Sequence, residues 1–297
     1  MYHYHPKHKL IDRASGSIGW KVNKESVVLL GGTRAVLMQI AHPLVAMGVS
    51  EHSDYMTDPF GRAKRTFMLG EILTFGSQGK ARQAARAINR KHFSVHGELP
   101  IDAGSFSKGT HYNARDPELL LWVHATLIDT WIQCYTLFVG TLTWTEQETY
   151  YQESKEIAHL LGLIPEKMPH SIDDLNEYID DMLNSGKLVA TPQARQIAQQ
   201  LLFPPALLLF RPLMHLNLQL TNALLPQQIR EVFGIEWNAR RQAIFDMSAR
   251  GMRAIIPRLP SYLRELPITR KLIQEATENL TKQNQAKQPR YMNYQLM

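Results

Sequence analysis

The stretch DPELLLWVHATLIDTWIQCYTLFVG, residues 116–140, is apolar on nearly every face once it is wound as an α-helix. A helix of this kind belongs in the middle of a protein core, because a surface helix carries a polar face. Asp116, Pro117 and Glu118 are typical of a helix start, since aspartate caps free N–H groups and proline is tolerated in the first turn. The stretch therefore predicts a central helix around which the other segments pack.

The rest of the chain also gives mostly helical signals, with apolar residues recurring every three or four positions. Segment 27–49 contains Pro43, so we expect a kink just after His42. Thr145 to Glu148 has the pattern of a capping box that opens a helix over 146–161. No run alternates with period two between hairpin turns, so we expect no strands. Further helices are expected at 61–75, 79–95, 171–186, 191–202, 206–224, 227–233 and 238–255.

The chain shows neither internal repeats nor a linker rich in glycine or serine. It therefore predicts an all-α fold with a single helical domain, over residues 20–275. Residues 1–19 are expected to form a polar N-terminal arm. Residues 276–297 are basic, rich in amides and aromatic, and are expected to form a loose C-terminal tail.

Composition limits the classes of function. The chain has 33 Lys and Arg against 27 Asp and Glu, a net charge of +6, and no aromatic-spaced basic patch typical of nucleic-acid binding. Anionic lipid surfaces and the propionates of a haem are two acidic partners that could use this mild charge. The single cysteine, Cys134, excludes an internal disulfide and favours a reducing compartment. The first residues, MYHYHPKHKLIDR, are polar and lack the apolar run of a secretory signal. The expected location is therefore cytoplasmic, with membrane association left open.

Two apolar segments resemble membrane spans in length. Segment 27–49 contains Arg34, and segment 201–225 contains Arg211. A charge facing lipid costs a few kcal/mol. We therefore interpret both segments as buried helices and leave open that one face lies near a membrane.

One histidine lies on the apolar side of a short basic helix, within SQGKARQAARAINRKHFSVHG, residues 77–97. His92 is four residues after Ile88 and three before Val95, so it shares their face. Two interpretations stay open: a hydrogen-bonded core histidine, which is the commoner case, and a metal ligand, for instance to a haem iron. His96, four residues on, competes as the ligand, although the glutamate of a zinc-protease HExxH motif is missing.

The preceding helix has a complementary face. Arg62, Thr66 and Gly70 are four residues apart, and Leu69 and Leu73 continue the face. A glycine lets a wide, flat group approach the backbone, and an arginine with a threonine can hydrogen-bond dioxygen or an acidic group. The alternative is an arginine that reaches solvent and a threonine bonded to its own helix.

The central helix carries a polar set that must be satisfied if it is buried. If the set lines a cavity, His124 is expected to contact a cofactor and Thr126 to take part in catalysis. Ordinary core hydrogen bonding is the equally good alternative for both residues.

Several blocks of this chain together resemble the rubber oxygenase (latex clearing protein) and MpaB-type oxygenase family. They run in order from about Trp20 to Pro267, so the resemblance covers most of the chain. The most specific strings are H-x-x-V-x-G and Arg-x-x-x-Thr at a helix start. The matching blocks are AVLMQIAHPLVAMGVSEHS (35–53), DPFGRAKRT (58–66), INRKHFSVHG (88–97), HYNARDPELLLWVHATL (111–127), LLFPP (201–205) and LLPQQIREVFGIEW (224–237).

The resemblance implies an all-α fold with a globin-like helical core and a bound haem b. The family's proximal iron ligand falls on His92, and its distal arginine and threonine fall on Arg62 and Thr66. Where rubber oxygenases have a lysine that caps the iron, this chain has Arg65, which is always charged and a poor ligand. The family's upstream glutamate base falls near apolar Ala46; the carboxylates nearest to it in sequence are those of Glu51 and Asp54.

The expected function is therefore that of a haem b-dependent oxygenase that uses dioxygen on a hydrophobic substrate, unsaturated and lipid- or isoprenoid-like. An electron donor and peripheral contact with a membrane are further partners to consider; nucleic acid is not, and the oligomeric state stays open. Two alternatives remain. One is a haem-binding carrier or sensor without turnover, and the other is a helical module that binds a lipid or a partner without haem.

Overall fold

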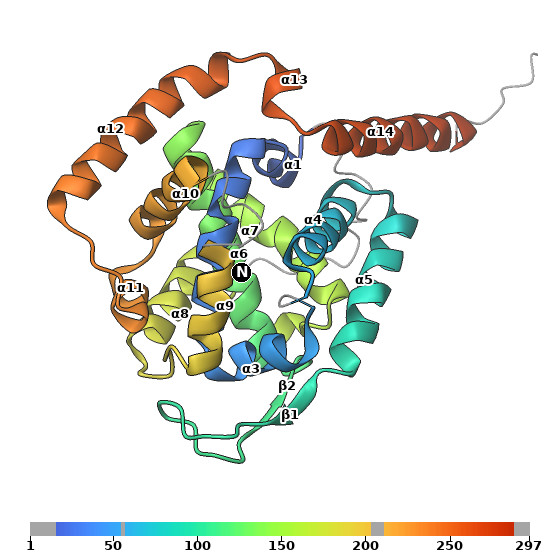
Figure 1. Cartoon of the computed structure of the whole chain (residues 1–297). Coiled ribbons are helices and arrows are strands. Elements are labelled where there is room, and N and C mark those ends of the chain that lie inside the picture. The colour runs from blue at the N-terminus through green and yellow to red at the C-terminus, as the bar shows by residue number, and fades with distance from the viewer. Residues whose placement is uncertain (1–15, 55–56, 203–210, 288–297) are drawn as a thin grey trace, which may run out of the picture.

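The computed structural model describes residues 16–54, 57–202 and 211–287, and its architecture is all-α, as the sequence predicts (Figure 1). Three predicted segments lie partly outside the described residues: the start of the helix at 206–224, most of the N-terminal arm, and the end of the C-terminal tail. The α-helices are α1 (Ile18–Asn23), α2 (Gly32–Ile40), α3 (Pro43–His52), α4 (Pro59–Phe75), α5 (Gln78–Phe93), α6 (Pro117–Phe138), α7 (Trp144–Leu160), α8 (Ile172–Asn184), α9 (Pro192–Leu202), α10 (Arg211–Leu224), α11 (Gln227–Phe233), α12 (Ala239–Ile255), α13 (Ser261–Arg264) and α14 (Pro267–Lys287). Short 3-10 turns are η1 (Ser26–Gly31), η2 (Pro165–Lys167) and η4 (Ile256–Arg258).

Helix α6 is the central helix that its sequence predicts, and Figure 1 shows it in the middle of the other helices. The Asp116 carboxylate accepts a hydrogen bond from the Glu118 N–H at 2.9 Å, which caps the helix start. Trp122 is fully buried, and its indole N–H donates to the Met38 carbonyl at 3.1 Å. The central helix is thereby joined to α2 by a polar bond as well as by apolar packing.

The expected kink after His42 is a complete break. The helical stretch Ser26–Ile40 and helix α3 are bent by 108° relative to each other. Pro43 stands in the first turn of α3, where its missing N–H costs nothing. Among the described residues no single helix is long and apolar enough to cross a membrane; this bent pair alone passes on length and composition.

A buried arginine connects three helices around the core. Arg34 on α2 is 2% exposed, and its Nε donates to the Leu224 carbonyl of α10 at 2.7 Å. Its other nitrogens donate to Thr130 at 2.5 Å and to Asp129 at 2.7 Å, both on α6. Burying a guanidinium is costly, and here its partners lie on two other helices, so the arginine holds α2, α6 and α10 in fixed relative positions.

Two expectations about local structure need correction. The capping box of α7 is formed by Thr143 and Glu146, two residues before the one we expected, because these two exchange hydrogen bonds at the required three-residue spacing. The structure also contains an antiparallel pair of strands, β1 (His96–Glu98) and β2 (His111–Asn113). Three-residue strands are too short to produce a period-two pattern in the sequence.

The C-terminal helix α14 extends well into the stretch that we expected to be a loose tail. It runs to Lys287, and its first half is anchored to α4 and α5. Thr269, which is 2% exposed, donates a hydrogen bond to the buried Glu71 of α4, and Lys80 of α5 pairs with Glu275 at 2.6 Å. Residues 288–297 lie outside the described residues.

Candidate functional site

Helices α4 and α5 form a helical hairpin that carries most of the predicted site residues (Figure 1). The Asp58 carboxylate caps α4 by accepting from the Gly61 N–H at 2.8 Å, and only Gly76 and Ser77 separate the two helices. The small residues Ala84 and Ala85 of α5 are buried against Leu73 of α4, so the two backbones can approach closely. Further contacts to this cluster come from Leu69, Ile72, Ile88, Ile157, Leu160 and Leu161.

The hairpin brings the two predicted halves of the site to the same end. Arg62 lies near the start of α4 and His92 near the end of α5, at similar distances in sequence from the turn. At 1.5 Å per residue, each is about 20 Å from the turn along its helix. Arg62 therefore lies at about the same level of the hairpin as the last turn of α5, and Thr66 lies about 6 Å nearer the turn between the helices.

His92 is partly buried, and its Nδ1 atom is buried without a hydrogen-bond partner among the described residues. Burial lowers the pKa of His92, so its ring is neutral near pH 7. An unpaired buried nitrogen costs about 1–3 kcal/mol. A neutral imidazole with unused hydrogen-bonding capacity is the form of histidine that binds a metal with its other nitrogen and donates from this one.

His96 does not share the helical face of His92. Helix α5 ends at Phe93, and His96 is exposed on strand β1, where its Cα pairs with that of Asn113. The four-residue spacing that would let two histidines chelate one metal holds only along a continuous helix. The structure therefore separates the two competing histidines and leaves His92 as the one attached to the hairpin.

The residues after His92 anchor the end of α5 to helix α3. Val95 is 8% exposed and packs in a cluster with Leu44 and Met47. At Gly97 an added Cβ would lie 2.5 Å from the hydroxyl oxygen of Tyr112, closer than any real contact. The valine and glycine of H-x-x-V-x-G thus have a structural explanation: together they fix the position of the helix end that carries His92.

The predicted face of α4 is divided between two environments. Leu69 and Leu73 pack against α5, whereas Thr66 and Gly70 are exposed and Arg62 is partly buried. A Cβ added at Gly70 would meet nothing within 4 Å. The glycine and the exposed hydroxyl of Thr66 therefore border open space, and Arg62 lies one turn away on the same side of the helix.

Arg65 points away from this face. Its guanidinium pairs with Asp58 at 2.9 Å and with Asp54 at 3.3 Å, and all three side chains are largely exposed. The hydrogen bond from Arg65 lowers the pKa of Asp58. Because an arginine stays charged and this one is held by two carboxylates, it does not take the place of a capping lysine.

The two site residues predicted on α6 have partners elsewhere in the core. The Nε2 atom of His124 is 3.1 Å from the Ser154 hydroxyl of α7, and burial lowers its pKa to about 4. Thr126 is fully buried; its hydroxyl donates to the Val123 carbonyl and accepts from Gln39 at 3.2 Å. The structure brings neither side chain to the hairpin face, and the core alternative accounts for the bonds of both.

A polar cluster that the sequence did not single out lies beside the anchored helix end. The buried Tyr112 hydroxyl donates to Glu51 and is 3.1 Å from Nε2 of His52. Burial and the neighbouring Glu51 carboxylate raise the pKa of Tyr112. With Asp54 paired to Arg65, both carboxylates nearest to the family's base position, Glu51 and Asp54, are engaged. The string HYN (111–113) gives no signal for the Tyr112–Glu51 contact, because the two residues are far apart in sequence.

A second buried histidine shares one property with His92. His42, at the break between α2 and α3, is 5% exposed, and its Nδ1 also lacks a partner among the described residues. Burial lowers its pKa to about 4, and its ring packs against Phe106 at 5.2 Å. The charges of Lys187 and Asp116 also act on this histidine, and it lies directly before α3 rather than on the hairpin.

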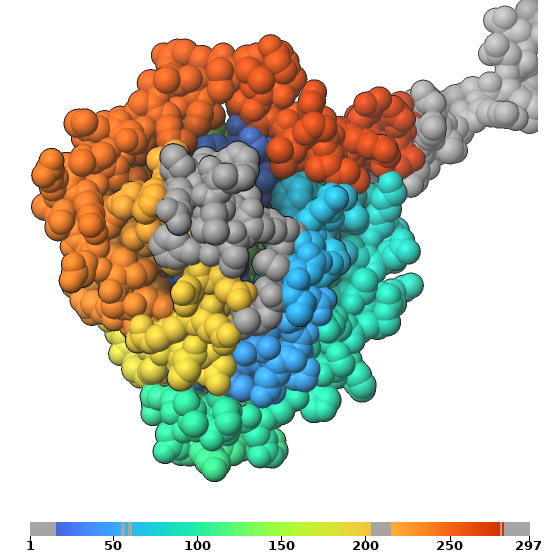
Figure 2. Space-filling view, in the orientation of Figure 1, coloured from blue at the N-terminus to red at the C-terminus, as the bar shows by residue number. Residues whose placement is uncertain are grey.

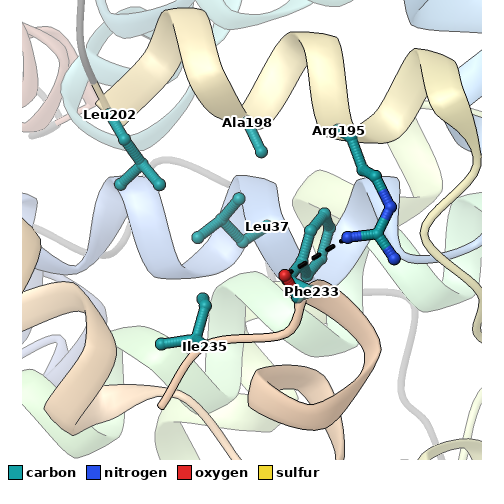
Figure 3. Close-up of a pocket in the computed structure, with 6 residues that line it drawn as sticks. All are labelled: Leu37, Arg195, Ala198, Leu202, Phe233 and Ile235. Atoms are coloured by element: carbon teal, nitrogen blue, oxygen red, sulfur yellow. Dashed lines mark hydrogen bonds between the residues drawn. The ribbon is translucent and has the colours of Figure 1, made fainter. Parts of the chain in front are cut away.

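An apolar pocket lies away from the hairpin, between α2, α9 and the loop after α11 (Figure 3). The Arg195 guanidinium borders it and donates to the Phe233 carbonyl at 3.3 Å. At about 160 Å³ the pocket is smaller than the 300–1,000 Å³ usual for cofactor sites. Its lining residues are Leu37, Arg195, Ala198, Leu202, Phe233 and Ile235.

The donor chemistry of the described residues limits the kind of metal site they allow. They contain no group of three or more His, Cys, Asp or Glu side chains that could hold a metal ion. A haem iron takes four ligands from its porphyrin and one or two from the protein, so a single histidine is enough for it.

Comparison with known proteins identifies the family of this chain. The model of the family "ER-bound oxygenase mpaB/B'/Rubber oxygenase, catalytic domain" matches residues 20–254, and the chain belongs to this oxygenase family. An uncharacterised protein of Mycobacterium tuberculosis (strain ATCC 25618 / H37Rv) is 27% identical over 219 residues, which are 71% of this chain and 82% of the relative. An uncharacterised protein of Mycobacterium bovis matches to the same extent. No solved structure matches the chain significantly.

Proposed function

We propose that this protein is a haem b-dependent oxygenase in which His92 binds the haem iron. The observation that carries the proposal is the buried, unpartnered ring nitrogen of His92 at the anchored end of a hairpin in a chain of the oxygenase family. When bound, haem iron supplies the activation of dioxygen. Binding and orienting the reacting groups would be the task of the hairpin residues.

The α4 face carries two hydrogen-bonding side chains at the end of the hairpin where His92 lies. Arg62 and Thr66 offer a guanidinium and a hydroxyl one turn apart, suited to an anionic or polar group bound beside them. Gly70 leaves space where a side chain would stand. His92, neutral through burial, is in the protonation state that a metal requires.

For the substrate we propose a small hydrophobic molecule, unsaturated and lipid- or isoprenoid-like, together with dioxygen and an electron donor. Support comes from the apolar side chains that surround the hairpin. Leu69, Ile72 and Ile88 are only partly buried where α4 and α5 meet. An apolar molecule that covers them gains about 25 cal/mol for each Å² removed from water.

A visible-light spectrum of the purified, haem-supplemented protein tests the cofactor. The proposal expects a Soret band that is lost in His92→Ala and kept in His96→Ala, a matched control because His96 is exposed on β1. Absence of the band in the unmodified protein would contradict haem binding and leave the lipid- or partner-binding module. A band without oxygen uptake on hydrophobic alkenes would favour a carrier or sensor.

A further inference from the structure

Helix α12 presents apolar side chains to solvent on the side opposite the core. Phe245, Ala249 and Met252 face inward and pack in the main core. Ile244 and Met247 are 54% and 66% exposed. An amphipathic helix needs one apolar face to dock on its own protein. Helix α12 has a second one.

The outward residues form a continuous stripe. Ile244, Met247, Gly251 and Ile255 follow each other at intervals of three or four, which places them on one side of the helix, and Ile255 is 61% exposed. Figure 2 shows α12 and the following segment, in orange, along the rim of the molecule. We call the exposed apolar residues Ile244, Met247, Ile255, Tyr262 and Leu263 the outer face of α12–α13; the last two are 61% and 57% exposed.

The charges around this stripe are nearly all positive. Helix α12 contains four arginines and a single carboxylate, Asp246, which accepts a hydrogen bond from Gln242 at 2.8 Å. Arginine stems can lie along an apolar surface while their guanidinium groups reach a polar layer above it. The exposed arginines of this region are Arg240, Arg241, Arg250, Arg253 and Arg258.

We propose that the outer face of α12–α13 docks on an anionic lipid surface. The argument is charge complementarity combined with apolar exposure: a helix with an uncovered apolar stripe and bordering arginines lies in the membrane interface, with the stripe among the acyl chains and the arginines at acidic headgroups. A protein partner would need an equally extended acidic rim around an apolar centre. The proposal concerns a surface outside the hairpin and does not depend on haem.

Cosedimentation of the full chain with lipid vesicles tests the proposal. Binding is expected to phosphatidylcholine vesicles that contain phosphatidylserine, to be much weaker without phosphatidylserine, and to fall at 1 M salt, where the Debye length is about 3 Å. Arg240→Gln with Arg250→Gln, which removes two exposed arginines that border the stripe round the helix, is expected to weaken binding about fivefold per arginine. Ile244→Ser with Met247→Ser is also expected to weaken binding, although it leaves the charge of the helix unchanged.

The control for charge is Arg82→Gln with Arg86→Gln, which removes two positive charges from the exposed side of α5. The control for apolar exposure is Ile164→Ser, because the Ile164 side chain is 46% exposed outside α12. These variants are expected to bind vesicles as the unmodified chain does. If the control variants lost as much vesicle binding as the α12 variants, the outer face of α12–α13 would not be the binding surface. The proposal itself would be wrong if the unmodified chain did not bind phosphatidylserine vesicles at low salt. It would also be wrong if the chain self-associated instead and the α12 variants abolished that self-association.

Discussion

Replacing Gly97 by alanine is expected to destabilise the fold at the point where α5 joins strand β1. The added methyl would lie 2.5 Å from the hydroxyl oxygen of Tyr112, 2.8 Å from Cζ and 3.0 Å from Cε1. Tyr112 cannot swing aside freely, because its ring is 2% exposed and its hydroxyl donates to Glu51. Either the strand or the tyrosine must shift.

The cost follows from overpacking a tight contact, about 1–3 kcal/mol. If the tyrosine gives way, losing its hydrogen bond to the Glu51 carboxylate adds about 1.5–3 kcal/mol at most. Gly79→Ala is the matched control, since it also replaces a glycine near α5 but meets nothing within 4 Å. That change is expected to stabilise the helix by about 0.5–1 kcal/mol.

Urea unfolding followed by far-ultraviolet circular dichroism measures both changes. A double-mutant cycle with Tyr112→Phe adds a sharper criterion: the combined loss is expected to be smaller than the sum, because the closest clashing atom is gone. A Gly97→Ala protein as stable as the unmodified chain, or strictly additive losses in the cycle, would refute the close-approach reasoning.

The remaining predictions concern charged side chains. Arg34→Ala is expected to cost about 3–5 kcal/mol in urea unfolding, because it leaves the partners of a buried guanidinium without a donor; a loss below about 1 kcal/mol would contradict the network. Burial raises the pKa of Glu71 above 4.5, so its ionised form opposes folding; Glu71→Gln is expected to be more stable than the unmodified chain at neutral pH, and this advantage should disappear below pH 4.5. The hydrogen bond from Lys21 lowers the pKa of Glu146 to about 2. Its contribution to stability is present above 4.5 and lost toward pH 2, so the deficit of Glu146→Gln should shrink over that range; a deficit that is independent of pH would count against the pair.

Much of the fold could be predicted because its signals are local. Asp116 before Pro117 marks the start of α6, and Ser171 with Asp174 marks the start of α8; the structure has both caps. The predictions are wrong where a contact between residues far apart in sequence determines the local structure. Strand β1 forms because it pairs with β2 across a long loop. The first half of α14 is held by distant residues, Glu71 of α4 and Lys80 of α5.

The candidate site could be predicted only in part. Periodicity placed His92, Arg62 and Thr66 on two facing helices, and the hairpin brings these ends together. The same periodicity could not tell that His124 turns toward Ser154 on α7, because an all-apolar helix gives no direction for a single polar side chain. Nor could it find the contact between Gly97 and Tyr112, which depends on strand pairing.

The measurement that tests the central claim most directly is rescue of haem ligation in His92→Gly. Removing the imidazole leaves a space that free imidazole can enter, so the account predicts a Soret spectrum that is altered in the variant and restored by added imidazole. His42→Gly, which also removes a buried histidine with an unpartnered Nδ1, is expected to keep the original spectrum. An unaltered spectrum in His92→Gly, or a loss confined to His42→Gly, would contradict the account.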